Sequence, residues 1–449
     1  MTQTLVNSKS KLFRKLEKNT MSSIYYDLST QPKNFSELFK LRSSSQTEIQ
    51  NDLGCFVVRN DLPQQDIGKT NYGVVLLDGF PWIGSEHQTA QSIADKLTDN
   101  IEHNKEVIKS LRGQPAIVYV TDQYVMFSRC GAPTKNLYYF YDPDDKVFTV
   151  TSFNLDLQSR HGNYMRVRES LLYIFDKHNF EMQVEQFKTW NFKQYRTNWD
   201  RVYETHEHVT RMNHQTKSLY MLSSGMDSGV IDCALNNLDI EHHVCHVITE
   251  IEEDNAVLNE RLRLNDKKNV HMIRATLNSE NPARNPYFEY LNMRDGFLPG
   301  RNGLIFLDSH HLIYNKICKP LGLYSVVQGQ GGDTLFADYG FRGKRSRPGS
   351  LFGGVFPANL EEVWSEVVVA GQSVRESLDV LWGIQGMDVS YPLLDVDLTQ
   401  EFLDTSRELK NSRYKNWLAQ YMEDSKYPYS NLKGGWGGFL WEKLVDMNI

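Results

Sequence analysis

Short runs of apolar and aromatic residues alternate with turn residues between Gly54 and about Phe153. The runs read CFVVRN, YGVVLLDGF, AIVYVT, YVMFSR, LYYFY and KVFTVTSF. They are rich in Val, Ile, Tyr and Phe, as strands are, and turn residues such as Asp122-Gln123 separate them. Short strands separated by turns predict an antiparallel β domain. A helical stretch, roughly Thr89 to Leu111, interrupts this pattern.

The period of the apolar residues changes after about Lys217. The pattern predicts a strand at SLYMLSS, a helix at VIDCALNNL, a strand at HVCHVIT and a helix at NAVLNERLRLNDKK. Farther along, YSVVQGQGG repeats the strand-then-glycine pattern. Strands that alternate with helices indicate a mostly parallel sheet with helices on both faces. The fold class is therefore predicted to be α/β, with an antiparallel β domain at residues 1–200 and a parallel-sheet domain at residues 201–449.

Two stretches carry weaker patterns. Residues 1 to about 50 are polar and rich in Ser and Lys, which predicts a loosely held lead-in that can include one helix. Residues 155–216 are rich in aromatic and charged residues, and we interpret them as the connection between the domains.

Composition narrows the possible functions. Of the 449 residues, 40% are hydrophobic and 23% charged, as is usual for a soluble globular protein. A formal charge of −7 disfavours a nucleic-acid or anionic-membrane binder, because both need a basic surface. The chain has neither a long apolar run nor the apolar stretch of a secretory signal, so the cytoplasm is the expected location. Its five scattered cysteines form no C-x-x-C pair, which disfavours a disulfide framework or a structural zinc site.

The sequence LSSGMDSG, from Leu222 to Gly229, lies between a predicted strand and a predicted helix. In open α/β sheets, ligands bind at the carboxyl ends of the strands. Small residues there let backbone N–H groups approach phosphate oxygens, and the helix that follows directs its partial positive charge at the anion. The loop lacks a Walker lysine, so it is not an ordinary P-loop. A small-residue turn without a ligand is the alternative interpretation.

The sequence QGQGGDTLF, from Gln328 to Phe336, also follows an apolar strand. Its glycines suit a tight turn beside a ligand, with Asp333 able to bind a cation. Because Mg²⁺ prefers one or two carboxylates together with phosphate oxygens, Asp227 and Asp333 are predicted to share this ion. A plain glycine turn with a capping aspartate is the alternative.

Four segments in this order resemble the class B asparagine synthetase family, which includes β-lactam synthetases and lasso-peptide cyclases. SSGMDSG resembles the S-G-G-x-D-S signature of the N-type PP-loop ATP pyrophosphatases, and GQGGDTLFADY resembles the family's G-E-G-x-D-E-L-F-G-G-Y. GMDVSYPLLD resembles G-[LV]-E-[AV]-R-x-P-F-L-D, and Lys433 in NLKGGWGGF matches a lysine of a glycine-rich C-terminal segment. LRGQPAIVYVTDQYVMFSRCGAPTKNLYY is similar to the end of the family's glutaminase domain. The resemblance covers roughly residues 54–445.

This resemblance implies a degenerate Ntn-glutaminase-like domain followed by an adenine nucleotide alpha hydrolase-like PP-loop domain, with ATP and Mg²⁺ as cofactors. It implies that the pyrophosphate end of ATP is held by Ser223, Ser224, Gly225, Asp227 and Ser228. It places the adenosine beside Leu222, Val247, Gln328 and Gly329. It assigns the metal to Asp227 and Asp333, and stabilisation of the charge on the acyl-adenylate to Lys433.

The residues with which the family hydrolyses glutamine are replaced. The chain begins Met1-Thr2-Gln3, without the family's N-terminal cysteine nucleophile, and Asp78-Gly79-Phe80 replaces its N-G-E segment. Glutamine hydrolysis is therefore expected to be lost, with the β domain kept as a scaffold.

The acyl-transfer residues also differ from the family pattern. Gln330 stands where asparagine synthetases have glutamate and β-lactam synthetases have tyrosine. Glutamine cannot take a proton near neutral pH, so a third substrate class is predicted. Asp388 matches a family carboxylate and is the candidate base, with an exposed acidic residue as the alternative. Ser390 replaces the family's arginine, which argues against free aspartate as the substrate.

A basic segment follows Asp333, containing Arg342, Lys344, Arg345 and Arg347. A lid over the triphosphate, a site for an anionic substrate and a solvated basic loop are all compatible with it.

The leading hypothesis is a glutamine-independent ligase that adenylates a small-molecule or peptide carboxylate for attack by ammonia or an amine, which can belong to the same molecule. An ammonia-dependent asparagine synthetase is the second hypothesis, and a nucleotide-binding pseudoenzyme is the third. A homodimer is compatible with each of them, a membrane partner is not expected, and nucleic acid is disfavoured.

Overall fold

The computed structural model describes residues 24–28, 46–51, 54–59, 67–129, 134–152, 163–248, 255–264, 267–274, 309–345, 350–369, 372–383 and 385–430. The chain forms two compact units. The first comprises Met1–Cys130 and Lys135–Lys188, and the second comprises Gly131–Thr134 and Thr189–Ile449.

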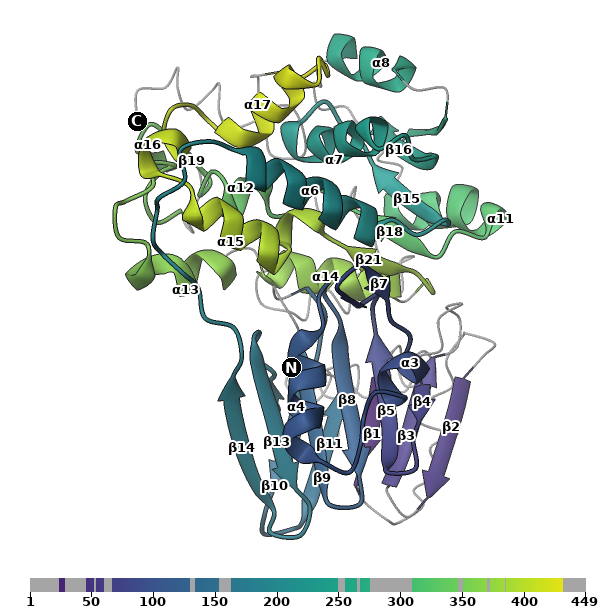
Figure 1. The fold of residues 1–449 in the computed structure, drawn as a ribbon. Helices are drawn as coiled ribbons and strands as arrows, with labels where there is room; N and C mark the ends of the chain where they lie inside the picture. Colours follow the sequence, from purple (N-terminus) through teal and green to yellow (C-terminus); the bar gives the residue numbers. More distant parts are fainter. Residues whose placement is uncertain are drawn as a thin grey trace, which may run out of the picture. The chain divides into compact units, whose positions relative to one another are not determined.

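The first unit contains two six-stranded antiparallel sheets (Figure 1). One sheet has the order β12-β10-β11-β1-β3-β2. Its strands are β1 (Ile24–Asp27), β2 (Gln46–Asn51), β3 (Gly54–Arg59), β10 (Tyr138–Asp142), β11 (Val147–Thr151) and β12 (Met165–Arg166). The other has the order β14-β13-β9-β8-β5-β4. Its strands are β4 (Ile67–Lys69), β5 (Gly73–Asp78), β8 (Ala116–Thr121), β9 (Tyr124–Arg129), β13 (Leu171–Asp176) and β14 (Glu181–Gln186).

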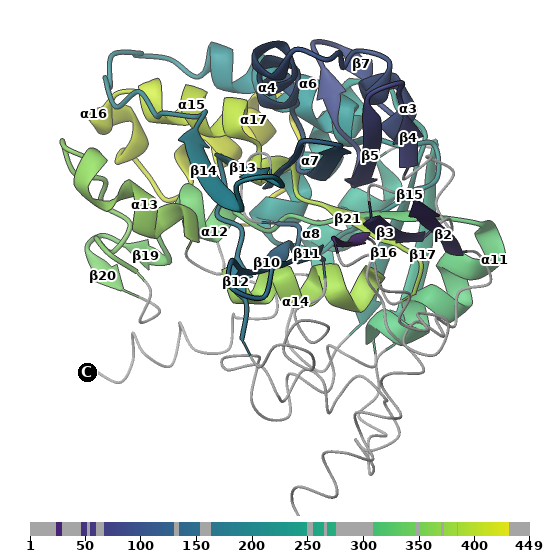
Figure 2. The ribbon, with the colours of Figure 1, turned by 90° about the horizontal axis from the view of Figure 1, so that it is seen from below.

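The central strands of the second sheet, β5, β8 and β9, are buried on both faces. Successive side chains of a strand point to opposite faces, so Val74 and Leu76 of β5 join the core between the two sheets. Val75 and Leu77 join a separate core under the helices α3 (Ala90–Ala94) and α4 (Ile101–Ser110). Figure 2 shows the resulting layers of helices, sheet and sheet. Burial on both faces explains why β5, β8 and β9 have continuous apolar runs instead of alternating ones.

Two predictions for this unit were wrong. The polar stretch before residue 50 contains β1 and β2, and β1 pairs with both β3 and β11. The predicted connection at residues 155–216 contains β13 and β14, which complete the second sheet. Strand β1 is only four residues long and its partners are distant in sequence, whereas β14 lies at an edge and is largely exposed. Neither situation produces a clear local pattern.

The second unit is built on a five-stranded parallel sheet of order β17-β16-β15-β18-β21. Its strands are β15 (Ser218–Met221), β16 (His242–Ile248), β17 (Lys268–Arg274), β18 (Ser325–Val327) and β21 (Asp388–Ser390). The first strand in the chain, β15, lies in the middle, and the chain runs outward first on one side and then on the other. The switch point between β15 and β18 is where open α/β sheets bind ligands.

Helices surround this sheet (Figure 1). They are α6 (Asp200–Asn213), α7 (Met226–Asn237), α8 (Asn255–Arg263), α11 (Lys319–Leu321), α12 (Gly332–Leu335), α13 (Glu361–Val369), α14 (Gln372–Gly383), α15 (Val396–Asp404), α16 (Arg407–Lys410) and α17 (Asn416–Asp424). Helix α7 packs against α6 and α17, and α14 packs against β21. The predicted fold class, an antiparallel β part followed by a parallel α/β part, is confirmed.

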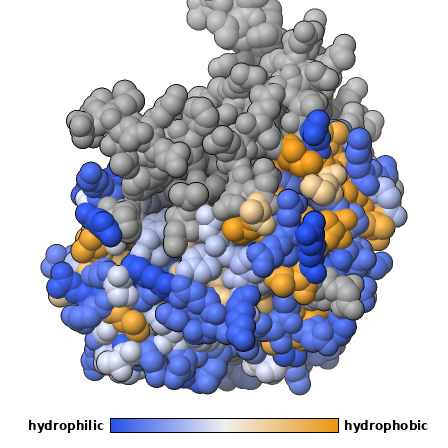
Figure 3. Space-filling model, turned by 90° about the horizontal axis from the view of Figure 1, so that it is seen from above, coloured by the Kyte–Doolittle hydropathy of each residue, from blue (hydrophilic) through white to orange (hydrophobic). Residues whose placement is uncertain are grey.

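Within the described ranges, no helix is both long enough and apolar enough to cross a bilayer. Hydrophilic residues cover most of the described surface when the molecule is viewed from above, and apolar residues form smaller groups among them (Figure 3).

Candidate functional site

The loop after β15 closes on itself through two serine side chains. The hydroxyl oxygens of Ser223 and Ser228 lie 2.9 Å apart, and the Ser228 oxygen also accepts the N–H of Ser223 at 3.0 Å. The N–H of Gly225 donates to the Ser223 hydroxyl at 3.2 Å. Helix α7 begins at the next residue, and its N-cap, Gly225, makes no side-chain capping bond. The first N–H groups of α7 therefore lack the usual N-cap acceptor, which is the arrangement that suits a bound anion.

The glycine segment after β18 packs directly against this helix start. A Cβ on Gly329 would lie 2.7 Å from the carbonyl carbon of Asp227, and one on Gly332 would lie 2.1 Å from the Asp227 carboxylate. Gly331 has a φ of +108°, in the region that glycine favours. Glycines are therefore required here because the two predicted motifs touch each other.

The aspartates of the two motifs meet at one ammonium group. The Nζ of Lys415 lies 2.5 Å from Oδ1 of Asp227 and 2.7 Å from Oδ1 of Asp333. The Lys415 side chain is 5% exposed, whereas those of Asp227 and Asp333 are 21% and 26% exposed. The tyrosine before the lysine, Tyr414, donates its hydroxyl to the same oxygen of Asp333 at 3.1 Å. The two carboxylates thus remain partly open to solvent on a side that the lysine does not cover.

Lys415 adopts an uncommon backbone conformation to reach this position. It is the N-cap of α17 with φ 46° and ψ 47°, a left-handed conformation that costs a non-glycine residue about 1–2 kcal/mol. Burial alone would lower the pKa of the Lys415 ammonium, but the charges of Asp227 and Asp333 hold its pKa well above the ordinary value. Burial also raises the pKa of the Tyr414 hydroxyl, against the opposing charge of Lys415. Local strain that the surroundings maintain is typical of functional sites.

The convergence of Asp227 and Asp333 bears on the predicted magnesium site. Two carboxylate oxygens within reach of one cation fit Mg²⁺, which takes one or two carboxylates and completes its shell with water and phosphate oxygens. Lys415 Nζ lies between these oxygens, so a metal ion bound to both would have to displace it. Nowhere in the described ranges do three or more His, Cys, Asp or Glu side chains converge as a metal site.

The residues predicted to surround adenosine lie near the carboxyl ends of the central strands. Leu222 is buried and its N–H donates to Cys245, which extends the pairing of β15 with β16. Val247, also buried, lies two residues beyond Cys245 on β16. Gln328 is buried directly after β18, and its N–H donates to the carbonyl of Ser390 at 3.1 Å. Ser224 is buried as well, and its hydroxyl has no hydrogen-bond partner among the described residues.

The structure places Asp388 and Gln330 at opposite ends of the neighbouring strands β21 and β18. Asp388 pairs with Ser325, where β18 begins, whereas Gln330 follows the end of that strand. The Asp388 side chain is buried and accepts the N–H of Val389 at 2.8 Å, so the alternative of an exposed surface carboxylate is wrong. Gln330 is partly exposed beside the loop, and Lys433 lies outside the described residues.

The basic segment forms a short hairpin of β19 (Gly340–Phe341) and β20 (Lys344–Arg345). Both residues of β20 are exposed, and Arg347 lies outside the described residues. The backbone of the hairpin is fixed by the N–H of Gly343, which donates to Gly353 at 3.0 Å.

Lys415 and Arg261 are site residues that the sequence patterns did not reveal. Lys415 directly precedes an apolar helix, and Arg261 lies in a helix rich in charged residues, so each looks like a solvated surface residue. Arg261 is in fact fully buried and contacts the serine loop. Gly229 carries a weak signal for it, since it directly follows the loop and leaves room for the guanidinium.

No protein-family model matches this chain, and no curated protein matches it. Among solved structures, it is similar to the allosteric regulatory enzyme of purine biosynthesis, with 12% identity, a TM-score of 0.28 and coverage of 59% of this chain and 76% of the other. It is also similar to the glutamine phosphoribosylpyrophosphate amidotransferase from B. subtilis, complexed with ADP and GMP. That match has 12% identity and a TM-score of 0.27, and it covers 59% of this chain and 78% of the other. The match with the NMN synthetase from Francisella tularensis has 14% identity and a TM-score of 0.22, and it covers 50% of this chain and 95% of the other. These overlaps are loose, and the candidate site stands on its own geometry.

Proposed function

We propose that this protein is an ATP-dependent ligase that adenylates a carboxylate, releases pyrophosphate and forms an amide with ammonia or an amine. The observation that carries the proposal is the placement of the two motifs. They follow the two strands on either side of the sheet's switch point, and their aspartates reach one cation position.

The chemistry of these groups suits a polyphosphate. The uncapped start of α7 offers N–H groups and a partial positive charge, and the hydroxyls of Ser223 and Ser228 offer further donors. The ammonium of Lys415 adds a full positive charge beside them. We infer that these groups hold the β and γ phosphates, while the α phosphate faces the acyl substrate.

Mg²⁺, held by Asp227 and Asp333, would neutralise charge on the leaving pyrophosphate. The substrate carboxylate forms a bond to the α phosphorus, and the bond from that phosphorus to the bridging oxygen breaks. Ammonia or an amine then bonds to the acyl carbon, AMP leaves, and the nitrogen loses a proton. The cations around the loop favour the first step, because negative charge accumulates on pyrophosphate as it departs.

We infer that the first unit provides no ammonia of its own. Asp78, in the segment that replaces the family's N-G-E, is buried and pairs with Lys135 at 3.4 Å. Gly79, the next residue, has a φ of +105°. Such an ion pair supports a structural part for this segment in place of glutamine binding.

Carboxylate-dependent exchange of labelled pyrophosphate into ATP tests the proposal directly. The purified chain, ATP and Mg²⁺ are incubated with a panel of carboxylates and without an amine, so that exchange reports the adenylate alone. Asp227→Asn should abolish the exchange, and Asp239→Asn, at an exposed ion pair with Lys267, should leave it unchanged. Release of phosphate in place of pyrophosphate would reject the mechanism.

Two further assays separate the other hypotheses. Asparagine formed from aspartate, ATP and ammonium would identify an asparagine synthetase. Tight ATP binding without exchange for any carboxylate would support a nucleotide-binding pseudoenzyme.

A further inference from the structure

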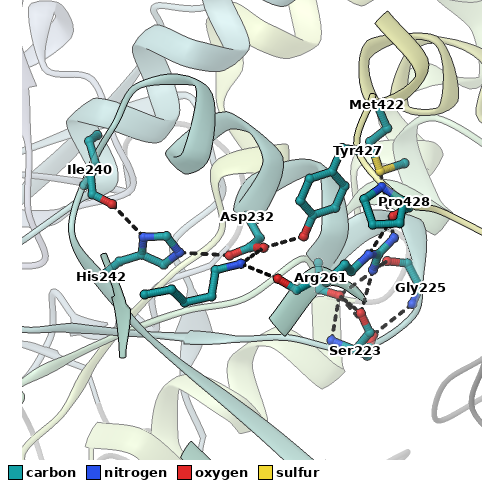
Figure 4. A network of polar contacts seen from close by, with 11 residues as sticks. Ser223, Gly225, Asp232, Ile240, His242, Arg261, Met422, Tyr427 and Pro428 are labelled. Atoms are coloured by element: carbon teal, nitrogen blue, oxygen red, sulfur yellow. Dashed lines mark hydrogen bonds and ion pairs between the residues drawn. The ribbon is translucent and has the colours of Figure 1, made fainter. Parts of the chain in front are cut away.

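A buried arginine of α8 donates hydrogen bonds to the backbone of the Ser223–Ser228 loop. The side chain of Arg261 is fully buried, and its Nη1 donates to the carbonyl oxygens of Ser223 at 2.6 Å and Gly225 at 2.9 Å. Its Nε donates to the carbonyl of Pro428 at 2.9 Å. Figure 4 shows the guanidinium lying between the loop and the segment of Tyr427 and Pro428. One side chain thus ties two distant stretches of the chain together.

The contact with the loop depends on a glycine in the loop motif itself. A Cβ on Gly229 would lie 2.5–2.6 Å from the Cζ and both Nη atoms of Arg261, closer than real Cβ contacts. Gly229 lies within α7, where glycine is unfavourable by about 1 kcal/mol relative to alanine. Its presence therefore has a packing reason, which is the passage of the guanidinium across the first turn of the helix.

The direction of these bonds matters for the loop. Each peptide group presents its N–H and its C=O in opposite directions, so fixing the carbonyl oxygens of Ser223 and Gly225 on Arg261 also fixes where the adjoining N–H groups point. The Gly225 carbonyl also accepts the N–H of Gly229 at 3.1 Å, so the arginine and the first turn of α7 hold the same peptide group. Arginine suits this position, because its guanidinium is planar, carries several N–H donors and stays charged at any physiological pH.

A second group of polar residues fixes Arg261 and Tyr427 in turn. The buried carboxylate of Asp232 accepts from Nε2 of His242 at 2.9 Å, from Nζ of Lys268 at 2.6 Å and from the Tyr427 hydroxyl (Figure 4). Lys268 also donates to the backbone carbonyl of Arg261 at 2.9 Å. Burial would raise the pKa of Asp232, but the hydrogen bonds and charges of His242 and Lys268 hold its pKa below the ordinary value. The carboxylate therefore stays ionised. The Cζ of Arg261 lies 5.3 Å from the centroid of the Tyr427 ring.

We propose that Arg261 is a positioning residue that sets the affinity for the polyphosphate by orienting the peptide groups of the Ser223–Ser228 loop, without touching the nucleotide. This proposal rests on the function proposed above. It assigns a binding role to Arg261, Gly229 and Asp232, and it predicts that damage to this network weakens binding of the phosphates more than binding of the nucleoside.

Calorimetric titration of the full chain with α,β-methylene-ATP and with AMP, both with Mg²⁺, tests this role. Arg261→Ala should weaken binding of the triphosphate analogue about 10- to 100-fold, which is the range of one charge-assisted hydrogen bond. It should weaken binding of AMP less than about threefold. Gly229→Ala, which keeps the guanidinium but displaces it, should act in the same direction. In the Arg261→Ala protein, adding Gly229→Ala should weaken binding of the analogue by less than about a further twofold, because the guanidinium that the new methyl group would meet is absent.

Arg375→Ala is the matched control. Arg375 is also buried and donates to a backbone carbonyl, that of Val368 in α13, at 3.0 Å. Its loss should lower stability while leaving the ratio of the two affinities unchanged. If Arg261→Ala does not fold, Gly229→Ala carries the same comparison.

The outcomes separate the two proposals. Equal weakening of both ligands by Arg261→Ala and Gly229→Ala, or no weakening, overturns the positioning role and leaves the proposed function intact. Failure of the unaltered protein to bind the triphosphate analogue overturns the proposed function and this role with it.

Discussion

Replacing Lys415 with methionine removes the ammonium from between Asp227 and Asp333 and keeps a side chain of similar length. Both carboxylate oxygens lie within 2.7 Å of the same nitrogen, so they are at most about 5 Å apart. Methionine and lysine are both unbranched, so the left-handed conformation at this position costs each about the same. The change therefore isolates the loss of charge.

The expected loss of stability follows from this geometry. Two unit charges about 5 Å apart repel by about 3 kcal/mol at an effective dielectric constant of about 20. That value agrees with the roughly 3–5 kcal/mol observed when one partner is removed from a buried ion pair. In a unit of this size, a change of about 3 kcal/mol lowers the melting temperature by about 6–12 °C.

Thermal unfolding with and without MgCl₂ is the assay. In Lys415→Met the carboxylates are open to a metal ion, so Mg²⁺ should recover most of the lost stability, and it should raise the melting temperature of the unaltered protein much less. Lys267→Met removes a surface ion pair with Asp239 and should change stability by less than about 1 kcal/mol. The reasoning fails if Lys415→Met is as stable as the unaltered protein without Mg²⁺, or if Mg²⁺ stabilises both to the same extent.

Four further predictions concern the same unit. Gly332→Ala places a methyl group 2.1 Å from the Asp227 carboxylate, so ATP–pyrophosphate exchange should fall more than about tenfold, and an unchanged rate would contradict the close packing of the two motifs. Asp333→Asn should lower the exchange rate about 100-fold, a loss of roughly 2.7 kcal/mol in transition-state stabilisation. Asp338→Asn, at a carboxylate that holds the backbone of residues 351 and 352, should lower stability and keep exchange in the protein that remains folded. Burial lowers the pKa of Lys410 to about 7, so the folded state loses a proton that the unfolded chain keeps up to about pH 10. Stability should therefore rise between pH 7 and pH 10 by at most about 1.4 kcal/mol per pH unit, and urea titrations of Lys410→Met should lack that part of the slope.

The sequence predicted those parts of the fold in which local pattern and tertiary position agree. The strands β5, β8, β9, β15 and β16 are apolar and end in small or turn residues, and each appears where the pattern indicated. The serine loop and the glycine segment were recognisable because backbone geometry demands small residues where chains approach closely. The meeting of Asp227 and Asp333 was predictable from the rule that ligands bind at strand ends.

Residues whose burial depends on distant partners were not predictable. A lysine or arginine is usually solvated, and only the assembled unit shows that Lys415 and Arg261 are buried against carboxylates and carbonyls. Strand β1 presents the same difficulty, since its four residues gain their hydrogen bonds from β3 and β11.

The bond between Lys415 and Asp227 spans 188 positions of the chain. A fragment cut anywhere between the serine loop and Lys415 keeps the loop and the carboxylate of Asp227 but loses the cation that compensates it. Under the proposed function, such a fragment keeps an uncompensated negative charge at the start of α7, which repels a triphosphate unless Mg²⁺ takes the place of the ammonium. We therefore expect a fragment that ends before Lys415 to bind ATP more weakly than the whole chain does, and most weakly without Mg²⁺.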